Sequence, residues 1–203
     1  MTTLRALALV CTLKKGDEKS SSSLLAQQVL DELARHDCVG ELVRVVDHDV
    51  AFGVTTDEGD GDGWPAIREK VLAADIVLVS TPIWMGQPAS VAKVALERLD
   101  AELSETDDAG RPSMFGKVAG IAVVGNEDGA HHVTAEVAQA LVDVGFTVPA
   151  QAVTYWVGEA MGSVDYQDLD EAPEKTAGTT RTLAANAAHL ARLLRDANYP
   201  VPE

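Results

Sequence analysis

The sequence contains no apolar run that approaches the roughly 20 residues a membrane-spanning helix needs. Its first residues also lack a charged segment followed by a small-residue cleavage site, so we interpret residues 4–11 as a first strand and not as a signal peptide. The 2 cysteines, Cys11 and Cys38, form neither a disulfide framework nor a C-x-x-C motif. These absences favour a cytoplasmic protein that has no membrane partner.

Positive charge is scarce as well. The chain has 16 Lys and Arg against 32 Asp and Glu, which gives a formal net charge of -16. Such a chain is repelled by the phosphates of nucleic acids and by anionic membranes, so we expect neither as a partner. A basic protein partner is compatible with this charge, although solubility alone also explains it.

The length and composition predict one domain. The chain has 203 residues, 46% of them hydrophobic, which is enough to bury one continuous core. We find no internal repeat, low-complexity segment or linker, and therefore expect a single domain over residues 1–203. Apolar strands and amphipathic helices alternate five times along it. The expected strands are residues 4–11, 42–46, 76–79, 118–124 and 151–157.

This alternation predicts an α/β fold with a five-stranded parallel sheet, helices on both faces and right-handed crossovers. Five such strands most simply take the order 2-1-3-4-5. The chain then reverses direction between the first and third strands, so the loops that follow them, residues 12–23 and 82–87, meet at one edge of the sheet. Ligands of open parallel sheets bind outside this edge, and we expect the functional site there.

The first of these loops has the features of an anion site. It carries Thr12, Lys14 and the run of four serines that begins at Ser20, at the expected start of a helix. Hydroxyl groups and free N–H groups at a helix N-terminus, at the positive end of the helix dipole, bind anions. A flexible serine-rich loop with an ordinary serine N-cap explains the same residues. There is no G-x-G-x-x-G and no G-x-x-x-x-G-K-[ST], so neither a dinucleotide fingerprint nor a Walker loop applies.

The second loop carries a tryptophan. Trp84 lies between the third expected strand and a helix predicted to start at Pro88, where a missing N–H costs nothing. A lone tryptophan is more often a core or interface residue. Its position beyond the end of a parallel strand instead favours the wall of a ligand site, with Met85 beside it.

These residues resemble a known family. The segment T-P-I-W-M-G-Q-P followed by V-A-K-V-A-L-E-R-L-D is similar to the T-P-x-[YW]-x-G-x-x-x-x-x-x-K-x-x-x-[DE]-R segment of flavodoxin-like NAD(P)H-dependent FMN reductases. The first loop resembles their phosphate loop, and G-N-E-D-G-A after the fourth strand resembles a third flavin-facing loop. The resemblance covers nearly the whole chain and implies a flavodoxin-like three-layer sandwich.

The resemblance also implies the cofactor and its site. FMN would be the cofactor and NAD(P)H the co-substrate, with the flavin ring between the loops at 82–87 and 125–129. A flavin ring needs an apolar wall and nearby backbone donors, which these loops can supply. The residues assigned to the phosphate are Thr12, Lys14, Ser20, Ser21 and Ser22. Those assigned to the ring are Pro82, Ile83, Trp84, Met85, Gly86, Gln87, Gly125, Asn126, Glu127, Asp128 and Gly129.

The expected function is that of an FMN-dependent NAD(P)H oxidoreductase of the flavin or quinone reductase type, which transfers hydride by a ping-pong mechanism. A flavodoxin-type electron carrier without NAD(P)H activity is the alternative. The expected partner is a small-molecule electron acceptor, and we expect a homodimer or a higher homo-oligomer. We assign no catalytic side chain and no metal ligand.

Two other clusters have more than one interpretation. The adjacent His131 and His132 point in different directions on a helix, which favours a first turn capped near Asp128 over a metal site. The acidic segment from Glu58 to Glu69 has the spacing of a calcium-binding loop with Glu in place of Asp at its first position. It lacks flanking apolar helices, and a solvated loop that caps the helix at Trp64 explains it as well, so the question of a cation stays open.

Overall fold

A parallel sheet forms the middle layer of the protein, whose computed structural model describes residues 3–202. The parallel strands lie in the order β2-β1-β3-β5-β6, and a short strand, β4, pairs antiparallel with β3. This order confirms the predicted one. The strands are β1 (Leu4–Val10), β2 (Cys38–Arg44), β3 (Ile76–Trp84), β4 (Gln87–Pro88), β5 (Val118–Gly125) and β6 (Val153–Val157).

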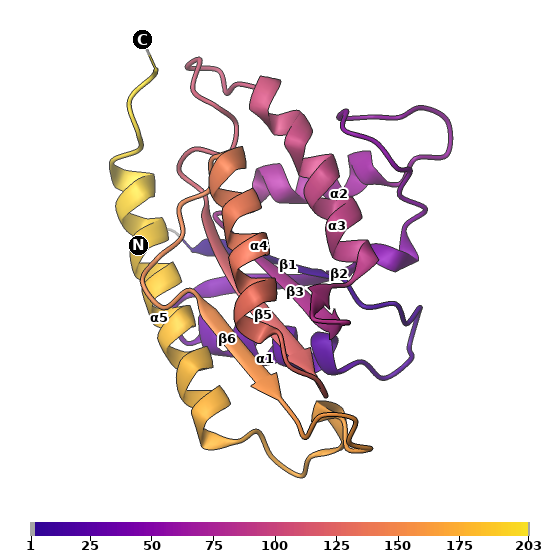
Figure 1. Cartoon of the computed structure of the whole chain (residues 1–203). Helices are drawn as coiled ribbons and strands as arrows, with labels where there is room; N and C mark the ends of the chain where they lie inside the picture. The colour runs from indigo at the N-terminus through magenta and orange to yellow at the C-terminus, as the bar shows by residue number, and fades with distance from the viewer. Residues whose placement is uncertain (1–2, 203) are drawn as a thin grey trace.

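Helices cover both faces of this sheet. Figure 1 shows α3 and α4 in front of the sheet and α1 behind it. The helices are α1 (Ser21–Ala34), α2 (Trp64–Ala73), α3 (Ser90–Leu99), α4 (Ala130–Val144) and α5 (Glu174–Asp196), with short 3-10 turns η1 (Val45–Asp47), η2 (Asp100–Ser104) and η3 (Tyr166–Asp168).

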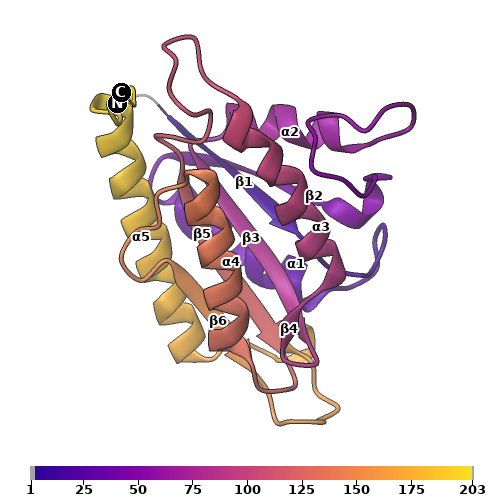
Figure 2. The same cartoon turned by 45° about the horizontal axis from the view of Figure 1, so that its top comes forward.

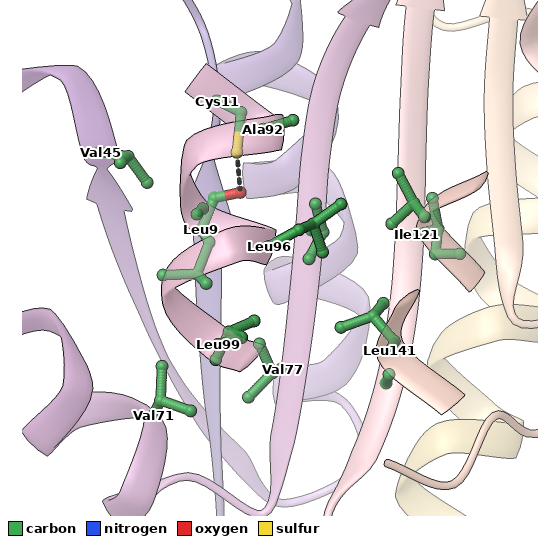
Figure 3. Packing of buried hydrophobic residues seen from close by; sticks show 14 of the residues in the cluster. Leu9, Cys11, Val45, Val71, Val77, Ala92, Leu96, Leu99, Ile121 and Leu141 are labelled. Carbon is green, nitrogen blue, oxygen red and sulfur yellow. Dashed lines mark hydrogen bonds between the residues drawn. The ribbon is translucent and has the colours of Figure 1, made fainter. Parts of the chain in front are cut away.

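The side chains of β1 alternate between two apolar cores. Leu7 and Leu9 belong to the core under α2, α3 and α4, whereas Ala6 and Ala8 belong to the core under α1 and α5. Successive residues of a strand point to opposite faces, so a strand covered on both sides must be apolar throughout. Figure 3 shows part of the first core, to which both Leu9 and the α3 residues Ala92, Leu96 and Leu99 belong. This burial anchors the sheet edge that carries the loops.

The β3–β4 hairpin corrects two predicted boundaries. Helix α3 begins at Ser90 and not at Pro88, because Gln87 and Pro88 pair with Trp84 and Ile83. The turn between them has Met85 at φ 52° and Gly86 at φ 72°. Two residues of positive φ are the geometry of a tight two-residue hairpin. Strand β3 therefore continues to Trp84 and folds back on itself.

Smaller boundary differences occur elsewhere. Strand β2 begins at Cys38, four places before the predicted start at residue 42, because it pairs with β1 from Leu4 onward. Strand β6 begins at Val153 and not at residue 151. Gly129, with φ 127°, stands at the N-cap of α4 where Asp128 was expected. Within the described residues, no helix is both long and apolar enough to span a membrane.

Candidate functional site

A cavity of about 350 Å³ opens at the carboxyl edge of the sheet, where the loops after β1, β3, β5 and β6 meet. Its volume lies within the roughly 300–1,000 Å³ typical of small-molecule sites. Figure 2 shows β4 and the loops after β5 and β6 together at this end of the molecule. The lining residues are Thr12, Leu13, Lys14, Ser20, Ser21, Ser22, Pro82, Ile83, Trp84, Val124, Gly125, Asn126, Glu127, Trp156, Met161, Asp165 and Tyr166.

One end of the cavity is the N-terminus of α1. Ser20 is the N-cap, and its Oγ accepts a hydrogen bond from the backbone N of Ser23 at 3.3 Å. The N–H groups of Ser21 and Ser22, in the same first turn, have no acceptor within the helix. Lys14 adds positive charge at this end of the cavity. Free N–H groups, hydroxyls and an ammonium together fit an anion such as a phosphate.

The opposite part of the cavity is apolar and is formed by the β3–β4 hairpin. The side chain of Trp84 is 52% exposed, so it is not a core residue. The Oε1 atom of Glu127 accepts a hydrogen bond from the backbone N of Met85 at 2.9 Å. A β carbon on Gly129 would lie only 2.8 Å from the Cα of Gly86. The hairpin and the loop after β5 are therefore held against each other.

A third wall, which we did not predict, comes from β6 and the segment that follows it. Trp156, Met161, Asp165 and Tyr166 all line the cavity. The ring of Tyr166 packs against that of Trp156, with centroids 5.5 Å apart, and its hydroxyl donates to Oε1 of Gln28 in α1 at 2.6 Å. The rule that placed a site beyond β1 and β3 applies to the end of β6 too. Trp156, inside that strand, was the sequence signal that could have indicated this wall.

The titratable groups here are not arranged for nucleophilic chemistry. The lining contains no cysteine and no histidine. Cys11, at the base of the first loop, is fully buried, and burial raises the pKa of its thiol to about 12. Burial also raises the pKa of the Tyr166 phenol, against a smaller opposing effect of its hydrogen bond to Gln28. Both groups are protonated at neutral pH, so the arrangement suits the binding of a reactive cofactor.

The two histidines of α4 have different partners. His132 Nε2 lies 3.0 Å from Oε1 of Glu136, and His131 Nε2 lies 3.2 Å from the hydroxyl of Tyr155. They do not converge on a common point. Among the residues that the structure describes, no group of three or more His, Cys, Asp and Glu could hold a metal ion.

The acidic loop before α2 is organised by a buried arginine. The side chains of Arg98 and Asp62 are 0% and 1% exposed, and Nη2 of Arg98 donates to Oδ2 of Asp62 at 2.7 Å. Arg98 also donates to the carbonyl groups of Ala51 and Thr55. Asp62 accepts from the backbone N of Trp64 as well, although Gly63 occupies the N-cap position of α2. Asp62 is therefore engaged by protein donors.

The predicted site residues fall into two groups. Eleven of them line the cavity: Thr12, Lys14, Ser20, Ser21, Ser22, Pro82, Ile83, Trp84, Gly125, Asn126 and Glu127. The other five, Met85, Gly86, Gln87, Asp128 and Gly129, belong to the same two loops but are not among the lining residues. Leu13 and Val124 line the cavity and were missed, together with the third wall.

Comparison with known proteins gives the family. A family model described as NADPH-dependent FMN reductase matches residues 4–161. The chain belongs to this family. The 8-demethyl-8-aminoriboflavin-5'-phosphate synthase of Streptomyces davaonensis is 34% identical over 206 residues, which cover 97% of this chain and 80% of that protein. The crystal structure of RosB with the bound intermediate 8-demethyl-8-formylriboflavin-5'-phosphate superposes with a TM-score of 0.87 and 33% identity, covering 97% of this chain and 82% of that one.

A further relative of this chain is a much longer protein. The divalent metal cation transporter MntH of Mycobacterium bovis is 36% identical over 199 residues. The match covers 95% of this chain but only 29% of the transporter's length, so the name of the whole protein describes mostly sequence without a counterpart here. At the level of the fold alone, an archaeal flavodoxin superposes with a TM-score of 0.59 at 8% identity.

These findings confirm the predicted family, fold and cofactor. The protein has a flavodoxin-like three-layer sandwich and is an oxidoreductase-type enzyme. The family name gives FMN and, as co-substrate, NADPH. The cavity fits FMN on its own evidence, because a helix N-terminus with free N–H groups lies at one end and the tryptophan wall at the other.

Proposed function

We propose that this enzyme is an FMN-dependent NAD(P)H oxidoreductase that passes reducing equivalents to a small-molecule acceptor by a ping-pong mechanism. One observation carries the proposal: a single cavity combines the free N–H groups at the start of α1 with an exposed tryptophan wall, and its lining has neither a thiol nor an imidazole. Bound FMN supplies the hydride chemistry there.

The chain's own residues would then bind and orient. We assign the phosphate to the N–H groups of Ser21 and Ser22, the hydroxyls of Thr12 and Ser20, and the ammonium of Lys14. Pro82, Ile83 and Trp84 would form one wall for the ring, and the loop from Gly125 to Glu127 the other. Glu127 keeps the two walls together through its bond to the backbone of Met85.

Rapid mixing tests this function. The protein is loaded with FMN under anaerobic conditions and mixed with NADPH or with NADH. We expect the flavin absorbance to bleach within seconds and to return when a quinone or free flavin is added as acceptor. Bleaching by dithionite but by neither pyridine nucleotide would overturn the proposal and support the electron-carrier alternative.

A second candidate is a flavin-modifying enzyme, in which FMN is the molecule that is changed. The observation that favours it is the likeness to RosB, with a TM-score of 0.87 and 33% identity. The intermediate in that structure has a formyl group at position 8 of the flavin. Mass spectrometry of the flavin after repeated turnover separates the two functions, because a reductase returns FMN unchanged.

We also propose that residues 1–203 form one domain, that the chain assembles as a homodimer or a higher homo-oligomer, and that it works in the cytoplasm. Met85, in the β3–β4 hairpin, and Met161, which lines the cavity, are 88% and 95% exposed, and exposed apolar side chains of this size support a contact between copies. Two buried free cysteines are compatible with a reducing compartment. Light scattering coupled to gel filtration tests the assembly, and a monomer at all concentrations would refute it.

A further inference from the structure

The third wall of the cavity contains a carboxylate that we have assigned neither to the phosphate nor to the ring of the flavin. Asp165 lines the cavity, and it lies on the segment between β6 and α5. This segment is held by a hydrogen bond on either side of Asp165. On one side, the backbone N of Met161 donates to the carbonyl of Asn126 at 2.9 Å. On the other, the backbone N of Gln167 donates to Oγ of Ser21 at 3.3 Å.

These contacts place Asp165 between the two ends of the cavity. Asn126 belongs to the loop assigned to the flavin ring, and Ser21 belongs to the helix N-terminus assigned to the phosphate. In FMN the part that joins ring and phosphate is the ribityl chain, which carries hydroxyl groups. With the ring and the phosphate placed as proposed, the ribityl chain would pass this carboxylate.

The hydrogen bonds of Asp165 leave acceptor capacity unused. Its Oδ1 accepts from Nδ2 of Asn126 at 2.9 Å, and its side chain also accepts from the backbone N of Asp168 in a capping box. An ionised carboxylate offers about four acceptor positions, so roughly half are filled. No Lys or Arg within the described residues forms an ion pair with it.

The charge of Asp165 limits what can occupy those positions. A phosphate dianion would be repelled by a carboxylate, and the more so in a partly buried site. A hydrogen-bond donor suits those positions, and the donors that FMN offers between its ring and its phosphate are the hydroxyls of the open-chain polyol. Asn126 holds the carboxylate in place, since its amide N also lies 3.4 Å from the carbonyl of Gly162.

We propose that Asp165, positioned by Asn126, accepts hydrogen bonds from the ribityl hydroxyls of the flavin and so selects polyol-bearing flavins over the bare ring. This inference rests on the proposed occupancy of the cavity by FMN. It assigns Asp165 a role in specificity and none in the redox step.

The test compares three ligands with wild type, Asp165→Asn and Asp168→Asn. FMN carries ring, polyol and phosphate; riboflavin lacks the phosphate; lumiflavin lacks both polyol and phosphate. Quenching of flavin fluorescence gives each dissociation constant. The variant Asp168→Asn is the matched control, because Asp168 belongs to the same capping box but does not line the cavity.

Asp165→Asn should weaken riboflavin about tenfold or more, the scale of one hydrogen bond to a charged group. Lumiflavin should bind the variant as it binds wild type. FMN should lose less than riboflavin, because removing the carboxylate also relieves repulsion of the phosphate. Asp168→Asn should leave all three affinities unchanged.

Equal losses for lumiflavin and riboflavin would overturn the inference, because the carboxylate would then contact the ring. So would an equal effect of Asp168→Asn, which would indicate a purely structural role. If wild type binds FMN and is bleached by NADPH but Asp165→Asn changes nothing, this inference fails and the proposed function stands. If wild type binds none of the three ligands, both fail.

Discussion

Replacing Ser21 by proline should remove one backbone N–H from the end of the cavity assigned to the phosphate and leave helix α1 intact. Ser21 is the first residue of the helix, a position where proline is well tolerated. The residue before a proline must be extended, and Ser20 already is, with φ -139° and ψ 124°. The substitution therefore deletes a donor with little cost to the backbone.

The size of the effect follows from the chemistry of the lost bond. A hydrogen bond to a charged group contributes about 1.5–3 kcal/mol, so one lost N–H to phosphate corresponds to roughly tenfold or more in affinity. The proline also removes the Ser21 hydroxyl, which accepts from the backbone N of Gln167. Ser21→Ala removes that hydroxyl and keeps the N–H, so the ratio of the two variants isolates the backbone donor.

The measurement is a fluorescence titration of wild type, Ser21→Ala and Ser21→Pro with FMN and with riboflavin. The net charge of -16 repels FMN from all three proteins alike, so it cancels in the comparison at fixed salt. We expect Ser21→Pro to bind FMN about tenfold more weakly than Ser21→Ala, and riboflavin equally. Equal FMN affinities in two variants with wild-type circular dichroism would refute this placement of the phosphate.

Three other substitutions test the walls and the acidic loop. Trp84→Ala should weaken FMN by about 1–2 kcal/mol in a titration and change the melting temperature little, because the side chain is half exposed; unchanged affinity would contradict the ring wall. Gly129→Ala should lower both FMN affinity and stability, because its Cβ would lie 2.8 Å from the backbone of Gly86. The control Gly59→Ala is also at positive φ but has nothing within 4 Å, so it should cost only backbone strain of about 1–2 kcal/mol. Equal shifts in melting temperature for the two variants would argue against the clash. Burial by itself raises the pKa of Asp62, but hydrogen bonds from Arg98 and from backbone N–H groups lower this pKa overall. The ionised carboxylate therefore stabilises the fold fully above the unfolded pKa of about 3.9, and this stabilisation is lost as the pH falls below that value. Asp62→Asn should reduce the free energy of unfolding at pH 7 by about 3–5 kcal/mol. The melting temperature of the variant should also fall less steeply between about pH 5 and pH 3 than that of wild type. Parallel plots of melting temperature against pH for the two proteins would contradict this.

The order of the strands, and the meeting of the two loops at one cavity, followed from the sequence. In the sequence, β1 is a near-continuous apolar run, which indicates a strand covered on both faces. In the structure, its side chains alternate between the two cores. Strands that alternate with helices and cross over with one hand leave few possible orders. Local pattern and chain connectivity were therefore sufficient to bring the loop at Thr12 together with the loop at Trp84.

The hairpin after β3 depended on tertiary structure. Nothing local favours Met85 at positive φ, a conformation that glycine and asparagine adopt far more readily. The conformation is held by Glu127, 42 residues away in the sequence, whose carboxylate binds the backbone N of Met85. The same holds for the acidic loop, where Asp62 pairs with a buried arginine 36 residues away in the sequence.

The part of the third wall that follows β6 was likewise decided only by the folded structure. The segment after β6 has no helical or alternating pattern to place it. Its position comes from contacts such as the one between Tyr166 and Gln28, which are 138 residues apart. Periodicity reports which face of an element is buried, whereas a loop without periodicity takes its place from partners that only the fold brings near. For this reason the sequence determined where the cavity is, and the tertiary structure determined that Asp165 faces it.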